Sequence, residues 1–345
     1  MNTKTIIATS TLLGALALAA AGVGREAAAQ PKVEPNSWWR AYEVAPFVKT
    51  ADGRKLRVYC LGKGAPTAIL ESGLGDGAWG WRSIQPAIAK MTRVCAYDRA
   101  GLGGSDEAKG PRDVEAMASD LGAVVKAVGR GKPVLLVAHS LGGPIVRQYA
   151  YHHADNVAGF VLVDPSADHQ NERFRTVFPD FDKLNKVSYA PAQLCRKLLE
   201  KGPIAESAPE YKLCISKPPP DMPADLTRYH YAYLQSPAHY REVLAELEAA
   251  TGDTNARESD AARHPLGDKP LLVLTAGSPV RPPGSTDEQN RRFQQAWYEM
   301  HNEIAALSTR GRQRIVPGAS HYIHGDKPDV VIEAVREVLT EVRGR

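Results

Sequence analysis

Ser140 lies where an apolar run meets a pair of glycines. Residues 134–138 read Val-Leu-Leu-Val-Ala, and Gly142 and Gly143 follow the serine. A buried strand that turns sharply into a helix projects a serine hydroxyl outward, and small neighbours leave room for that hydroxyl. Ala138 stands where such a turn often has its first glycine, and alanine is also small. The pattern predicts that Ser140 is a nucleophile.

A serine hydroxyl becomes a good nucleophile only when a base takes its proton. We predict that His321 is this base, because it lies in the loop 318–325 that follows the last predicted strand. His324, in the same loop, is the alternative. His139 is adjacent to Ser140 in the sequence, but the turn directs it away from the hydroxyl, so we expect a structural role for it.

The base needs an acid to orient it, and two carboxylates are candidates. Asp164 directly follows the predicted strand 159–163 and is favoured. Since Asp before Pro is also a common turn residue, Asp164 has a structural alternative as a cap for the segment that starts at Pro165. The alternative acid is Asp287, which we expect well inside the loop that follows the predicted strand 270–275.

A tetrahedral intermediate needs two backbone N–H donors directed at its oxyanion. Leu141, immediately after the serine, supplies one. The loop that begins Ser-Gly-Leu-Gly-Asp at residue 72 lets the backbone approach a substrate closely, and we predict Leu74 as the second donor.

The segment 75–80 also matches the G-x-G-x-x-G pattern of dinucleotide-binding loops, with Asp98 about twenty residues beyond it. We reject this interpretation, because Trp79 and Trp81 crowd the segment and its glycines already have a role beside Ser140. The sequence has no His-Glu-x-x-His or paired Cys-x-x-Cys spacing that would indicate a metal site. We therefore expect catalysis without a cofactor or a metal.

The elements that must position these residues alternate along the chain. β-branched runs and helical stretches with apolar residues every three or four positions predict an α/β fold, a mostly parallel sheet with helices on both faces. The predicted strands are 55–60, 67–71, 93–97, 133–138, 159–163, 270–275 and 312–316. The predicted helices between them are 113–128, 143–152 and 328–342.

Roughly a hundred residues separate the strand ending at Val163 from the next one, which indicates an insertion. We divide the mature chain into a core, 30–164 and 266–345, and a mostly helical cap, 165–265, with a helix near 240–250. Four tyrosines of the cap either line the substrate site or, as we expect, pack its own core: Tyr229, Tyr231, Tyr233 and Tyr240.

Residues 1–29 resemble a signal peptide. Lys4 precedes an apolar stretch, and Ala27 to Ala29 supply small residues before Gln30. A single membrane anchor is the alternative, but the stretch is barely long enough and only weakly hydrophobic. We expect a periplasmic or secreted protein with no stable membrane insertion after cleavage.

An oxidising compartment lets the four cysteines pair. Four cysteines allow three pairings, and we favour Cys60 with Cys95 and Cys195 with Cys214, with buried free thiols as the alternative. The 43 Lys and Arg residues against 39 Asp and Glu give a net charge of only +4, scattered along the chain, so a nucleic-acid partner is not expected.

These motifs resemble the α/β-hydrolase fold family, in its cap-containing serine hydrolase or esterase form. Besides the serine turn, the likeness rests on Tyr-Asp-Arg-Ala-Gly-Leu-Gly-Gly-Ser-Asp at 97–106 and on Gly-Ala-Ser-His at 318–321. It extends from about Leu56 to Val342. The resemblance implies the α/β-hydrolase fold, in which the strands carrying Cys60 and Cys95 are neighbours.

Family members usually carry the acid after the seventh strand. This sequence has none at that offset, which favours the less common position after the sixth strand, Asp164. A serine rather than an aspartate at the turn argues against the family's haloalkane dehalogenases and epoxide hydrolases.

The sequence therefore predicts an exported serine hydrolase that cleaves carboxylic esters, or lactones or amides, through a Ser-His-Asp triad and an acyl-enzyme intermediate. The expected partner is a small-molecule ester or amide substrate. The alternatives are an acyltransferase or peptidase with the same triad, and a non-catalytic ligand-binding protein that keeps the fold.

Overall fold

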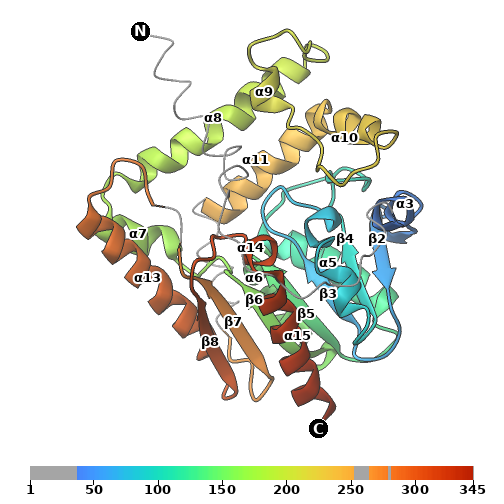
Figure 1. Ribbon diagram of the computed structural model, residues 1–345, viewed down its shortest axis with the longest axis vertical. Helices are drawn as coiled ribbons and strands as arrows, with labels where there is room; N and C mark the ends of the chain where they lie inside the picture. Colours follow the sequence, from blue (N-terminus) through green and yellow to red (C-terminus); the bar gives the residue numbers. More distant parts are fainter. Residues whose placement is uncertain (1–36, 252–263, 279–280, 345) are drawn as a thin grey trace, which may run out of the picture.

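The computed structural model describes residues 37–251, 264–278 and 281–344 (Figure 1). The predicted signal peptide, 1–29, lies outside these residues. The strands are β1 (Phe47–Lys49), β2 (Lys55–Leu61), β3 (Ala68–Glu71), β4 (Val94–Tyr97), β5 (Val134–His139), β6 (Val157–Val163), β7 (Leu271–Ala276) and β8 (Gly311–Val316).

The helices of the described residues fall before, between and after these strands. They are α3 (Ser37–Glu43), α4 (Gln85–Ile88), α5 (Val114–Val128), α6 (Gly142–His152), α7 (Gln170–Val177), α8 (Phe181–Leu199), α9 (Tyr211–Cys214), α10 (Thr227–Leu234), α11 (Pro237–Thr251), α13 (Asp287–Ala305), α14 (Ile323–Asp326) and α15 (Pro328–Arg343). Two short 3₁₀ helices are η1 (Ala78–Trp81) and η2 (Ala154–Asn156). None of the helices in the described ranges is long and apolar enough to cross a membrane.

The strands form one sheet in the order β1-β2-β4-β3-β5-β6-β7-β8. Strand β2 runs antiparallel to β1 and β4, and all other neighbours are parallel. All seven predicted strands are present with boundaries shifted by at most two residues. The three-residue edge strand β1 was not predicted, since such a short segment shows no periodicity.

Strand β5 explains why the sheet is covered on both faces. All six of its residues are buried. Val134 and Leu136 pack in one apolar cluster with α5, α6 and α13, whereas Leu135 and Val137 pack in a second cluster with α4 and α15. A parallel strand buried on both faces reads as a continuous apolar run, as β5 does.

Helix α13 corrects one prediction. We expected Asp287 inside a loop, but it is the first residue of this 19-residue helix. Thr286 caps the helix by accepting a hydrogen bond from the Gln289 N–H, and the Gln289 side chain accepts one from the Thr286 N–H. This capping box was the signal in the sequence that would have predicted the helix start.

The helices between β6 and β7 lie above the carboxyl ends of the strands, apart from α7 (Figure 1). Phe174 of α7 stacks on Phe293 of α13 with ring centroids 4.0 Å apart, so α7 packs on the core. The remaining helices, α8 to α11, share a small apolar cluster of their own that contains Cys195 and Cys214. We call α8 to α11, residues 181–251, the cap.

Both favoured cysteine pairings are present. Cys60 and Cys95 lie opposite each other in the ladder between β2 and β4 and form a disulfide. Cys195 of α8 and Cys214 of α9 form the second. The structure thus contains one disulfide in the sheet and one in the cap.

Candidate active site

Ser140 occupies the turn between β5 and α6. Its φ of 51° lies in the left-handed region, which is uncommon for a residue with a side chain. The turn is held by hydrogen bonds from the Ser140 N–H to Val163 O (3.2 Å) and from the Ser166 N–H to Ser140 O (2.8 Å). Strain of this kind persists only where surrounding structure enforces it, and it is common at functional sites.

Close backbone approach explains the small residues around Ser140. A Cβ on Gly142 would lie 2.6 Å from Glu71 O. A Cβ on Gly73 would lie 2.7 Å from the His139 ring and 3.2 Å from Ser140 Cβ. The loop that follows β3 therefore lies directly against the serine turn, and only glycine fits at these two positions.

Asp164 and His321 are in direct contact. The His321 Nδ1 and Asp164 Oδ2 atoms are 2.6 Å apart, so the carboxylate can hold the ring with Nε2 free for chemistry. The other carboxylate oxygen accepts hydrogen bonds from Trp297 Nε1 (2.9 Å) and from the Ala276 N–H (2.8 Å). These bonds fix the carboxylate from three elements.

Asp164 is charged in this setting. Its burial alone would raise the pKa of the carboxyl, but the hydrogen bond and the charge interaction with His321 outweigh burial and lower it. Asp164 is only 1% exposed, and its own φ is 45°. A buried carboxylate in contact with an imidazole holds that ring in a fixed orientation.

His139 and His324, the other two histidines considered in the sequence analysis, are both buried near His321. His139 Nε2 donates to the backbone oxygen of His321 (3.0 Å), and burial lowers the pKa of His139 well below its ordinary value, so a neutral ring holds the histidine loop. His324, the alternative base, is buried with its ring centroid 4.6 Å from that of His139 and 4.8 Å from that of Trp81. It makes no hydrogen bond to Asp164 in the described part of the chain.

Asp287, the alternative acid, is not brought to this site. Its side chain is 82% exposed and forms an ion pair with Arg281 at 2.7 Å. A capping box places Asp287 in the first turn of a surface helix, where a carboxylate interacts favourably with the helix dipole.

The two proposed oxyanion donors flank the serine turn. Leu141 immediately precedes the first residue of α6, and Leu74 lies in the loop that packs on Ser140. Within the residues that the structure describes, neither backbone N–H donates a hydrogen bond.

Residues that were not predicted also support the site. Trp297 lies on α13, the helix that the sequence pattern did not indicate. Arg99 is 1% exposed and forms ion pairs with Glu71 at 2.9 Å and with Glu246 of α11 at 2.6 Å. Glu71 is the last residue of β3 and Arg99 lies two residues after β4, so their positions at strand ends could have indicated a place near the site. Nothing in the sequence indicated that Glu246 would reach them.

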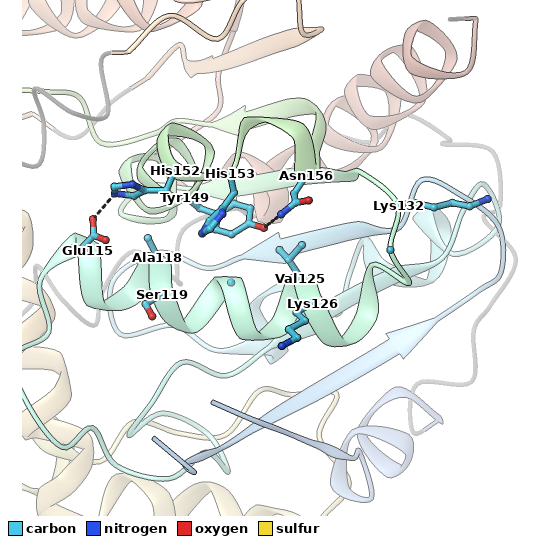
Figure 2. Close-up of a pocket in the computed structure, with 12 residues that line it drawn as sticks. Glu115, Ala118, Ser119, Val125, Lys126, Lys132, Tyr149, His152, His153 and Asn156 are labelled. Atoms are coloured by element: carbon cyan, nitrogen blue, oxygen red, sulfur yellow. Dashed lines mark hydrogen bonds and ion pairs between the residues drawn. The ribbon is translucent and has the colours of Figure 1, made fainter. Parts of the chain in front are cut away.

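The structure has cavities whose lining includes none of Ser140, His321 and Asp164. Figure 2 shows one of about 500 Å³ between α5 and α6, where Glu115 contacts His152 at 3.2 Å and Asn156 donates to the Tyr149 hydroxyl. Its lining does not include Ser140, His321 or Asp164, so this cavity is separate from the candidate active site.

A larger cavity, of about 620 Å³, lies between α3 and α10 of the cap. Its aromatic lining is Trp39, Tyr42, Trp79, Tyr229 and Tyr233. Tyr240, in contrast, is buried in the cap cluster and donates to Cys214 O. Tyr231 and Tyr233 also pack against the cap cluster, as we expected of the cap tyrosines, and the lining of this cavity includes neither Ser140 nor His321.

Comparisons with known proteins agree with this fold. A family model described as the alpha/beta hydrolase fold matches residues 66–198. An AB hydrolase superfamily protein of Gibberella zeae is 22% identical over 295 residues, which are 81% of this chain and 87% of that protein.

Solved structures show the same arrangement. An esterase from Thermogutta terrifontis aligns with a TM-score of 0.56 at 20% identity, over 86% of this chain and 98% of that one. An epoxide hydrolase aligns with a TM-score of 0.58 at 17% identity, over 86% and 98%. Given this sheet order, the serine turn and these likenesses, the chain has the α/β-hydrolase fold.

Proposed function

We propose that this protein is a serine hydrolase that cleaves carboxylic esters, with lactones and amides as related substrates. The observation that carries the proposal is the 2.6 Å contact between His321 and the buried Asp164 at the sheet edge where Ser140 occupies its strained turn. A nucleophile, a base and an orienting acid on the ends of β5, β8 and β6 suit acyl transfer.

The chemistry follows from these roles. Ser140 Oγ attacks the ester carbonyl carbon while His321 Nε2 takes the hydroxyl proton, and the carbonyl electrons move onto the oxygen held by Leu74 and Leu141. Collapse of this intermediate breaks the ester C–O bond, and His321 returns the proton to the departing alcohol. Water then attacks the acyl-enzyme by the same steps and restores Ser140.

The nucleophile distinguishes this activity from epoxide opening or dehalogenation. Those reactions, in the family's fold, need a carboxylate that forms an alkyl ester with the enzyme and then releases it by hydrolysis. Ser140 cannot do this, because a serine would form a stable ether rather than a hydrolysable ester. The esterase among the similar structures is thus the better guide to the chemistry than the epoxide hydrolase.

We also propose that the protein is periplasmic or secreted. The two disulfides support export, since such bonds persist in oxidising compartments. Residues 1–29 have the composition of a signal peptide. Fractionation of the native host with an antibody to the mature chain, together with N-terminal sequencing, tests this.

Labelling with a fluorophosphonate tests the function directly. The probe phosphonylates an activated serine whatever the natural substrate, and mass spectrometry then maps the adduct. We expect modification at Ser140 and turnover of p-nitrophenyl acetate or butyrate. If no serine is modified, the protein is instead a binding protein that keeps the fold. If Ser140 is modified but an alcohol accepts the acyl group faster than water does, the protein is an acyltransferase. If Ser140 is modified and dipeptides are cleaved faster than esters, the protein is a peptidase.

A further inference from the structure

The backbone on both sides of Leu74 is held by one buried ion pair. The N–H of Leu74 belongs to the peptide group whose carbonyl is Gly73 O, and Arg99 Nη2 donates to that oxygen at 2.6 Å. The next peptide group carries the N–H of Gly75, which donates to Glu246 Oε2 at 2.7 Å. Both peptide groups that meet at Leu74 are thus fixed by side chains.

Arg99 has no unused donor in this arrangement. A guanidinium has five N–H groups. Those of Arg99 donate to Glu246 Oε1 (2.6 Å), Glu246 Oε2 (2.9 Å), Glu71 Oε1 (2.9 Å), Ser72 O (2.7 Å) and Gly73 O (2.6 Å). Two of the five bonds therefore go to the backbone of the loop that begins at Ser72, and the cation cannot turn without breaking several of them.

The direction of the Leu74 N–H follows from these bonds. In a planar trans peptide the C=O and N–H point in opposite directions, so holding Gly73 O from one side aims the Leu74 N–H to the other. A cationic donor on the carbonyl also polarises the peptide and strengthens its N–H as a donor. Glu246 prevents the following peptide from rotating.

We infer that Arg99 and Glu246 are positioning residues that aim the Leu74 N–H at the oxyanion. Glu246 lies on α11, so the cap supplies part of the machinery that stabilises the transition state. The inference rests on the proposed function, and it adds that the cap acts on the rate of acyl transfer. Burying ions is costly, which suits a group retained for geometry rather than for stability.

Helix α11 offers a matched control one turn away. Glu242 accepts a hydrogen bond from Arg112 Nε at 2.6 Å, and Arg112 donates in turn to Asp120 at 2.8 Å. This second buried ion pair also joins the cap to the core, but its partners lie on α5 and in the segment before it rather than in the oxyanion loop. Losing it weakens cap docking without freeing Leu74.

The test compares Glu246→Gln with Glu242→Gln in the full-length mature protein. A glutamine at 246 has one acceptor oxygen for the three N–H groups that Glu246 now accepts, and its NH₂ opposes the guanidinium. We expect Glu246→Gln to lower kcat for p-nitrophenyl butyrate about 10- to 100-fold, less than complete loss of an oxyanion donor, with KM changed less than about threefold.

A transition-state analogue separates positioning from general loosening. The inhibition constant of a trifluoromethyl ketone, whose serine adduct carries an oxyanion, should rise in parallel with the fall in kcat. The pH profile of kcat should not shift, because His321 and Asp164 are untouched. Glu246→Gln and Glu242→Gln should lower Tm by similar amounts, because each breaks a buried ion pair between the cap and the core. In Glu242→Gln, however, kcat should stay within about threefold of the wild type.

Three outcomes would overturn the inference while leaving the proposed function intact: a normal kcat in Glu246→Gln, an equal loss of kcat in both variants, or an unchanged inhibition constant. If Glu246→Gln does not fold, Glu246→Asp keeps the charge but is one methylene shorter, and it should lower kcat about tenfold. A wild-type protein whose Ser140 resists fluorophosphonate would instead refute the proposed function itself, and with it this inference.

Discussion

The carboxyl edge of the sheet and the cap hold their residues in different ways. At the edge, Ser140 and Asp164 follow buried parallel strands, and backbone hydrogen bonds fix both at positive φ. In the cap, α8 and α11 pack around a small cluster with a disulfide, and Leu194 and Tyr229 remain exposed. The proposed nucleophile and acid thus belong to the sheet edge, where the backbone is firmly held, and the cap is a smaller unit that packs on this edge.

Arg99 and Glu246 are the exception, and they make the comparison useful. Through them the cap reaches the loop after β3, although it supplies neither nucleophile, base nor acid. Changes at the edge should therefore remove chemistry without loosening the fold, and changes in the cap should alter stability more than chemistry, except at Glu246. The following experiments test that division, in order of expected effect.

Removing the nucleophile should have the largest effect. We expect Ser140→Ala to reduce ester turnover at least about 10⁴-fold and to abolish fluorophosphonate labelling. Tm should stay within a few degrees, since Ser140 is held by its backbone and alanine is smaller than serine. Initial rates with p-nitrophenyl butyrate and a thermal melt measure both; retained turnover would refute the mechanism.

The orienting acid should come next. Asp164→Asn keeps the shape but cannot hold His321 in the required tautomer, so kcat should fall about 10³- to 10⁴-fold. Asp287→Asn is the matched control: its carboxylate is exposed and paired with Arg281, and kcat should stay within about twofold. Equal small losses in both variants would show that the contact between His321 and Asp164 is not used in catalysis.

Removing each disulfide in turn compares how much the sheet and the cap contribute to stability. The bonded cysteines are 35 residues apart in the sheet and 19 apart in the cap. By loop entropy, replacing the sheet pair with serines should cost about 4 kcal/mol of the free energy of unfolding, and replacing the cap pair about 3 kcal/mol. Denaturant unfolding measures this loss. We expect the Cys195→Ser and Cys214→Ser double variant to keep its rate of Ser140 labelling within a few-fold, and a far larger loss would mean that the cap holds the triad too.

The smallest effect should be in the pH dependence of stability. Burial lowers the pKa of His324 at the edge and of His239 in the cap to about 4. The unfolded chain binds these protons near its ordinary pKa of about 6.5, so each histidine stabilises the fold above that pH, and this contribution is lost as the pH falls toward 4.

Each contribution is at most about 3 kcal/mol, from a pKa shift of about two and a half units. The difference between wild type and His324→Gln or His239→Gln isolates each histidine. The free energy of unfolding should fall less between pH 7 and pH 4.5 in each variant than in the wild type. A fall as large as that of the wild type would contradict burial of the neutral ring.

The sequence predicted the sheet well because its strands are continuous apolar runs. It did not predict α13, whose polar surface hides the apolar positions of Trp297 and Ile304, or β1, which is too short to show a pattern. Nor did it predict that Glu71, Arg99 and Glu246 meet, because their contacts span 28 and 147 residues of chain.

The sequence thus predicts those features of the protein that depend on a local pattern. The serine turn, the alternation of strands and helices, and the histidine loop each depend on neighbouring residues, whose periodicity and size limit the backbone. The tertiary structure decided which carboxylate lies against His321 and which charges hold Leu74. Those choices depend on which strand ends and which cap helix come together in space, and contacts between distant segments form only when the whole sheet and its cap are packed.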